Sequence, residues 1–200
     1  NIFSSGTSAV AKLTVLAPLG QAVDAPGLVW STSGNAAWAS ESSVTHDGLS
    51  AAQSGLITDS QSCSSQTMVT GPGTLTFWWK VSSEEWFDYL TFYIDDLNQA
   101  AISGQVDWQQ QAFAVGSGNH TLTWTYAKDS SVSAGVDAAW LDQVIFITNP
   151  PVITLQPLSQ KGIMGAPMVL SGAASGAPPV TYQWLKDGTN LSGATSMSYV

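Results

Sequence analysis

The feature that most constrains the fold of this chain is the stretch from Thr74 to Asp96, where two runs of alternating apolar and polar residues flank a short acidic loop. Alternation with a period of two, rich in aromatic and β-branched residues, is typical of half-buried antiparallel strands. The residues that this pattern places on the inner face are Leu75, Phe77, Trp79, Val81, Leu90, Phe92 and Ile94. The sequence therefore predicts two strands here, each with one buried face.

The opposite face of these strands carries three large aromatic residues, Trp78, Tyr89 and Tyr93, which burial of the inner face does not explain. Aromatic rings can stack on the C–H faces of sugars, and Trp86 in the intervening loop would border such a surface. The outer side of these strands is therefore a candidate ligand-binding surface. The alternative, that this face packs under a loop or against a neighbouring domain, stays open because sandwich domains often bury part of both sheets.

Runs of the same kind occur at 108–115, 120–128 and 139–147, and the glycine-rich stretches at 71–73 and 116–118 are interpreted as breaks between strands. The run Asp95-Asp-Leu-Asn98 is predicted to be a hairpin turn. No segment shows sustained helical periodicity, so many strands at regular spacing predict an all-β sandwich or barrel. The residues predicted to fill its core are Phe77, Trp79, Leu90, Phe92, Leu122 and Trp124.

Charge and cysteine content exclude several classes of function. The 200 residues carry a net charge of −9 with 5 basic residues in all, whereas a surface that binds nucleic acid or an anionic membrane needs clustered Lys and Arg. No apolar run approaches the length that spans a bilayer. The single cysteine, Cys63, cannot form an internal disulfide, and no basic neighbour would activate its thiol.

The sequence Asn149-Pro-Pro151 indicates a linker, since two prolines block the continuation of a central strand. Beyond it, the stretches 174–179 and Tyr182-Gln-Trp-Leu-Lys-Asp-Gly188 resemble a bacterial immunoglobulin-like domain. The resemblance implies that Trp184 packs at the centre between two sheets, with Gly172 at the position of the usual cysteine. The strand Val10 to Leu16 resembles the last strand of a preceding copy, and we expect both ends of the chain to be parts of larger domains.

The middle region resembles the jelly-roll modules related to MAM domains and to the cleaved-adhesin domains of bacterial surface and secreted proteins. The stretches that carry the resemblance are Ala51–Gly55, Asp59–Gln61, Phe77–Glu84, Asp88–Asp95, Ser103–Trp108, Gly118–Trp124, Tyr126–Ser130 and Asp137–Asp142. The resemblance implies a concanavalin/MAM-like jelly-roll sandwich outside the cell, and Trp86 departs from its pattern. The predicted domains are 1–17 (end of an immunoglobulin-like domain), 19–148 (jelly roll) and 152–200 (start of a second immunoglobulin-like domain).

The resemblance also implies a structural calcium ion that ties the first strand to the last. Asp24 and Asp142 are placed to meet there if both termini of the jelly roll lie together. Asp142 alternates with Trp140 and Val144 on a face that should be apolar, so its carboxylate needs a partner. That partner is either calcium, which accepts carboxylate and carbonyl oxygens from loops, or a set of backbone amides.

Nothing in the sequence predicts catalysis. Glu84 and Glu85 are neighbours in a loop and would splay apart, whereas a glycosidase needs two facing carboxylates. His46 and His120 lack the spacing of a zinc site or a serine triad. Together with the resemblance, this leads us to expect a non-catalytic adhesion or carbohydrate-binding module of a large bacterial extracellular protein, with neutral polysaccharide or a cell-surface glycan or protein as its partner. The alternatives are a structural spacer and an accessory module of a secreted hydrolase.

Overall fold

The computed structural model describes residues 17–149, 151–163, 165–176 and 180–200. The strand predicted at 10–16 lies outside the described residues. The elements of the larger part of the chain are α1 (Leu19–Ala22), β1 (Trp30–Gly34), β2 (Ala39–Glu41), β3 (Ala51–Gln53), β4 (Ser62–Ser82), β5 (Tyr89–Ile94), β6 (Leu97–Ser103), β7 (Gln105–Ala127) and β8 (Ala138–Thr148). The prediction of an all-β fold with antiparallel strands is confirmed, and the single short turn of helix among the described residues is α1.

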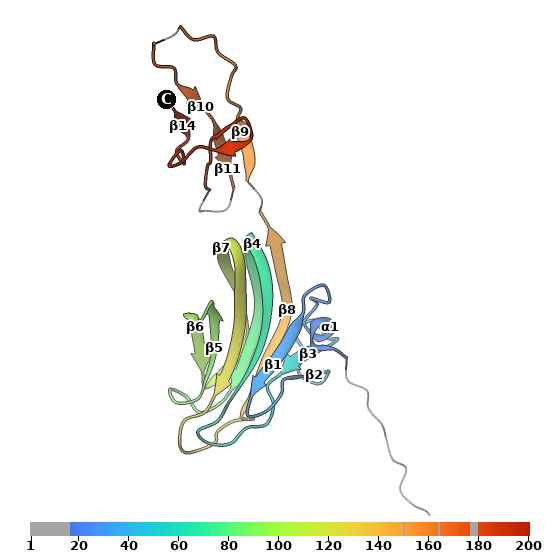
Figure 1. The fold of residues 1–200 in the computed structure, drawn as a ribbon. Coiled ribbons are helices and arrows are strands. Elements are labelled where there is room, and N and C mark those ends of the chain that lie inside the picture. The colour runs from blue at the N-terminus through green and yellow to red at the C-terminus, as the bar shows by residue number, and fades with distance from the viewer. Residues whose placement is uncertain (1–16, 150, 164, 177–179) are drawn as a thin grey trace, which may run out of the picture.

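Two long strands, β4 and β7, run side by side through the sandwich and connect its two layers (Figure 1). In the first layer, the N-terminal half of β4 pairs with β1, and the C-terminal half of β7 pairs with β5, which in turn pairs with β6. In the second layer, the other halves of β4 and β7 pair with each other, and β8, β3 and β2 follow in order. We call these two layers sheet A and sheet B.

Sheets A and B face each other across an aromatic core. Phe77 of sheet B lies with its ring centroid 4.9 Å from that of Phe92 and 5.2 Å from that of Trp124, both in sheet A. Phe113 of sheet B likewise lies 4.9 Å from Phe92, and Trp30 of β1 stacks on Trp124 at 5.6 Å. All six predicted core residues are at most 1% exposed, so the inward-facing assignment is confirmed.

The glycine-rich stretches at 71–73 and 116–118, which were predicted to be breaks between strands, lie within β4 and β7 and bend them. Gly71 pairs with Gly118 and Gly73 pairs with Val115, with a shift of register between them, at the point where β4 and β7 pass from one sheet into the other. A Cβ atom added to Gly71 would lie 1.9 Å from the carbonyl oxygen of Gly116. The two backbones therefore approach closely because no side chain separates them, which is the usual reason for glycine inside a strand.

The last strand of the sandwich, β8, contains a bulge that places Asp142. Thr76 pairs with Ile145 and Trp78 pairs with Asp142, so two residues of β8 lie opposite one residue of β4, and Gln143 has a φ of 48°. The bulge reverses the alternation, and Val144 therefore joins the core, while Trp140 and Asp142 face outward. The prediction that Asp142 and Val144 share one face was wrong because sequence periodicity does not reveal an inserted residue.

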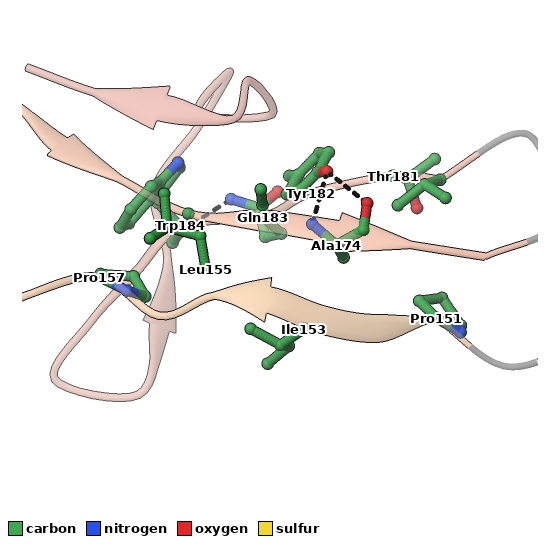
Figure 2. A pocket seen from close by; sticks show the side chains of 12 residues that line it. Pro151, Ile153, Leu155, Pro157, Ala174, Thr181, Tyr182, Gln183 and Trp184 are labelled. Atoms are coloured by element: carbon green, nitrogen blue, oxygen red, sulfur yellow. Dashed lines mark hydrogen bonds between the residues drawn. The ribbon is translucent and has the colours of Figure 1, made fainter.

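The remaining elements form three two-stranded pairings: β9 (Val152–Leu155) with β11 (Ala173–Ser175), β10 (Leu170–Ser171) with β14 (Ser198–Tyr199), and β12 (Leu185–Lys186) with β13 (Thr189–Asn190). An apolar groove lies beside β9 and β11, lined by Ile153, Leu155 and Trp184 among others (Figure 2). Trp184 is partly buried, and its Nε1 donates a hydrogen bond to the carbonyl oxygen of Ser196 at 2.8 Å. The immunoglobulin-like assignment and the domain bounds stay predictions. Among the described residues, no helix is both long and apolar enough to cross a bilayer.

Candidate functional site

The outer face of sheet A carries two rows of polar side chains that cross β1, β4, β7 and β5. One row is aligned by three strand pairings, those of Ser33 with Ser64, of Ser64 with Thr125, and of Thr125 with Thr91. The second row follows the pairings from Ser31 through Gln66 and Thr123 to Tyr93. With neighbouring strands about 4.8 Å apart, each row is about 14 Å long. The two rows offer many uncharged hydrogen-bonding groups and one aromatic ring, that of Tyr93.

Part of this face is hollowed into a shallow depression of about 350 Å³. Its lining residues are Ser33, Ser64, Gln66, Tyr93, Asp96, Thr123 and Thr125. Ser64 and Thr125 hydrogen-bond each other through their hydroxyls at 2.8 Å, which fixes the floor. Asp96 belongs to the two-residue turn between β5 and β6, where Asp95 and Asp96 both have positive φ, and the predicted hairpin turn is thereby confirmed.

Of the predicted binding residues, Tyr93 lies in this depression, and Tyr89 lies on the same face four residues away, about 13 Å along β5. The Tyr89 hydroxyl donates a hydrogen bond to the carbonyl oxygen of Trp86 at 3.0 Å, so Trp86 lies at the Tyr89 end of the face. Trp86 is 72% exposed and has a φ of 72°. These three aromatic residues therefore belong to the same side of the sandwich.

Trp78 lies on the opposite side of the sandwich, on the outer face of sheet B. Its ring is covered by the His46 imidazole, with the centroids 3.7 Å apart and the planes inclined by 17°. The expectation that Trp78, Tyr89 and Tyr93 form one surface was wrong, because β4 and β5 are consecutive in sequence but their aromatic segments belong to different sheets. Trp78 instead fits the alternative considered from the sequence, in which an outward-facing ring packs beneath a loop.

The structure brings Asp24 and Asp142 together with a third carboxylate, Asp47, and their ligand oxygens lie within 4.8 Å of one another. Val144 donates a backbone hydrogen bond to Val23, which holds the segment bearing Asp24 against β8. Asp47 had no sequence signal, because it reaches the cluster only through the loop that also places His46 over Trp78. The donor set of three carboxylates suits calcium.

Asp142 also has backbone partners. Its Oδ2 accepts hydrogen bonds from the amides of His46 at 2.7 Å and Asp47 at 3.4 Å, and its Oδ1 accepts one from the amide of Gln143 at 2.7 Å. Burial nevertheless raises the pKa of Asp142, and burial together with repulsion from Asp47 raises the pKa of Asp24. Both partners considered from the sequence, a cation and backbone amides, are thus compatible with this geometry.

The remaining candidate reactive groups are engaged in structural contacts. His46 Nδ1 lies 2.8 Å from Gln143 Oε1, and His120 Nδ1 lies 2.6 Å from Asp95 Oδ2 at the other end of the sheet from the β4–β5 loop. Cys63 is buried, and burial raises the pKa of its thiol. A raised pKa keeps the thiol protonated and therefore poorly nucleophilic.

No family model and no curated protein matches the chain. Similar solved structures include the secreted serine protease VesC from Vibrio cholerae, with a TM-score of 0.46, 17% identity and coverage of 56% of this chain and 24% of VesC. TmCBM61, solved in complex with β-1,4-galactotriose, has a TM-score of 0.46 and 16% identity, with 65% of this chain and 93% of that chain covered.

The K3 cleaved adhesin domain of Lys-gingipain from Porphyromonas gingivalis w83 has a TM-score of 0.42 and 13% identity, with 60% of this chain and 91% of that domain covered. This chain therefore spans about a quarter of VesC and nearly all of the two smaller structures.

Proposed function

We propose that residues 19–148 form a non-catalytic module that binds neutral polysaccharide on the outer face of sheet A, in a protein that works outside the cell. The observation that carries this proposal is the depression around Tyr93, where an aromatic ring from β5 borders hydroxyl and amide side chains from β1, β4 and β7. An aromatic ring offers apolar area to the C–H face of a sugar, while hydroxyls and amides hydrogen-bond its hydroxyl groups.

The charge of the molecule favours uncharged sugars. Asp96 borders the depression, and the chain as a whole carries a net charge of −9. Both would repel sulfated or uronic-acid polymers and reduce their rate of association. A neutral polysaccharide is therefore the preferred partner, and adhesion to a glycan-coated surface is the corresponding biological role.

Calcium at Asp24, Asp47 and Asp142 is a second part of this proposal. An ion there would join the segment before β1, the loop after β2 and the last strand. It would also offset the repulsion from Asp47 that, after burial, raises the pKa of Asp24. Its role would be structural, because the cluster lies with the β8 bulge and not with the depression on sheet A.

The binding proposal is tested by measuring the affinity of the whole chain for a panel of neutral and acidic polysaccharides, using affinity electrophoresis and calorimetry. We expect Tyr93→Ala to weaken binding at least about tenfold, which corresponds to about 1.4 kcal/mol. Trp78→Ala is the control, since this aromatic residue lies on the opposite face beneath His46.

Two results would contradict the proposal. One is a Tyr93→Ala protein that folds and binds as tightly as the parent while Trp78→Ala loses binding, which would move the site to sheet B. The other is a parent protein that binds no polysaccharide in the panel, which would favour the structural-spacer interpretation.

A further inference from the structure

A second group of carboxylates lies at the end of the sandwich where the β4–β5 loop meets the segment after β7. Glu84 and Asp88 come from the two ends of the loop, and Asp129 follows β7 by two residues. One oxygen of each carboxylate lies within 4.8 Å of the others. Asp88 Oδ1 accepts a hydrogen bond from the Asp129 amide at 2.9 Å, which holds the loop against this segment.

Two oxygens of this group are buried without a hydrogen-bond partner. Asp88 is 0% exposed, and its Oδ2 has no hydrogen-bond donor. Glu84 Oε2 is buried and unpartnered in the same way. A buried carboxylate oxygen that has lost its water and gained no donor is costly, and native structures rarely keep one without a partner such as water or an ion. The two oxygens therefore indicate a missing ligand that is positively charged.

Lys128 compensates this charge only in part, through an ion pair with Asp88. Its ammonium group is fully buried, and it donates hydrogen bonds to Asp137 and, at 2.8 Å, to the Ser133 hydroxyl. Asp88 Oδ2 lies 3.5 Å and Asp59 Oδ1 lies 4.0 Å from the same nitrogen. One lysine thus pairs with three carboxylates, those of Asp59, Asp88 and Asp137, while Glu84 and Asp129 add two more beside Asp88. Burial, followed by repulsion from Asp129 and Asp88, raises the pKa of Glu84.

We propose that Glu84, Asp88 and Asp129 bind a calcium ion. Calcium–oxygen distances are about 2.3–2.6 Å, so two ligand oxygens on opposite sides of one ion lie about 5 Å apart. The oxygens of this cluster lie within 4.8 Å of one another and so already have the spacing of a calcium shell. Calcium tolerates the irregular geometry of loop ligands, whereas magnesium demands a near-ideal octahedron. The ion would convert three mutually repelling carboxylates into ligands.

The site would control the loop that lies beside Tyr89. Between the two ligands Glu84 and Asp88, the loop exposes Trp86 by 72% and Phe87 by 55%. The Tyr89 hydroxyl donates to the Trp86 carbonyl, so the position of this loop is linked to the outer face of sheet A. Calcium bound at the base of the loop would hold these two aromatic side chains in one position.

The experiment measures calcium binding to the whole chain by isothermal titration calorimetry after chelator treatment, with the fluorescence spectrum recorded in parallel. Glu84→Gln keeps the size of the side chain and removes its charge. We expect it to weaken one class of calcium sites by at least about tenfold, since even changes outside the ligand shell have effects of that size. Asp129→Asn should have the same effect. Glu85→Gln is the matched control, because the neighbouring Glu85 is exposed and outside the cluster.

The Asp47→Asn variant separates this site from the Asp24, Asp47 and Asp142 cluster. The proposal requires a calcium site that survives Asp47→Asn and is lost in Glu84→Gln, with far-ultraviolet circular dichroism showing that both variants fold. Should Glu84→Gln misfold, Asp129→Asn decides the same question. The proposal is overturned if the parent binds no calcium, or if folded Glu84→Gln and Asp129→Asn proteins bind calcium like the Glu85→Gln control.

Discussion

Replacing Trp124 by alanine tests the core that joins the two sheets. Trp124 is fully buried, and its ring contacts Trp30, Phe77 and Phe92 at centroid distances of 5.6, 5.2 and 5.0 Å. These partners come from β1, β4 and β5, so the cavity left by the substitution would open between sheets A and B and could not collapse by moving one side chain. Tightly packed sites of this kind show the larger losses among core truncations.

The magnitude follows from two terms. Truncating a buried tryptophan costs about 3–5 kcal/mol. The buried Trp124 Nε1 has no hydrogen-bond partner, which destabilises the folded parent. Removing this unpaired N–H group therefore offsets the loss of stability by on the order of 1 kcal/mol. We therefore expect a net destabilisation of about 2–4 kcal/mol, which for a domain of this size lowers the melting temperature by roughly 4–16 °C.

The assay is urea denaturation of the parent and the variant, followed by far-ultraviolet circular dichroism, with hydrogen exchange of β4 and β7 peptides identifying the transition of the sandwich. Trp86→Ala is the control, since Trp86 is 72% exposed and should change stability by less than about 0.5 kcal/mol. If Trp124→Ala unfolded at the same urea concentration as Trp86→Ala, the inter-sheet packing described above would be refuted.

Three further predictions concern other parts of the sandwich. Gly71→Ala should lower the melting temperature strongly because the added Cβ would clash with a carbonyl oxygen 1.9 Å away, whereas Gly27→Ala meets no atom within 4 Å and should melt like the parent. Because burial raises the folded-state pKa of Asp142 above its unfolded value, calcium-free protein should become more stable as pH falls from 7 through that raised pKa, and Asp142→Asn should remove this gain in melting scans. Lys128→Met should destabilise the protein by about 3–5 kcal/mol in urea titrations at pH 7, because it leaves the buried Asp88 and its partner Asp137 without a counter-charge.

The local alternation of apolar and polar residues was sufficient to predict which face of each strand is buried. Phe77, Phe92 and Trp124 alternate with polar residues, and each faces the core, because successive side chains of a strand point to opposite sides. The turn at Asp95 and Asp96 was also predictable, since aspartate tolerates positive φ. These are properties of one or two neighbouring residues, and they do not depend on which strands become neighbours.

The candidate sites were predictable only in part. The sequence indicated Asp24, Asp142 and Tyr93, but not Asp47, nor the serine and threonine side chains around Tyr93 that come from β1, β4 and β7. Trp78 was assigned to the wrong surface, because a strand's periodicity separates inward from outward without saying which of two sheets it joins. The acidic loop at Glu84 and Asp88 had a visible charge pattern, and its third carboxylate, Asp129, lies more than forty residues further along the chain.

The sequence by itself determined that this chain forms β-strands with one apolar face, that its surface is poor in basic groups, and that its interior is filled by aromatic residues. The tertiary structure alone decided that β4 and β7 bend at Gly71 and Gly118 from one sheet into the other, and that the β8 bulge turns Asp142 outward. The reason is physical: side-chain alternation is set by the backbone of a single strand, whereas bends, bulges and meeting carboxylates depend on pairings between segments far apart in the chain.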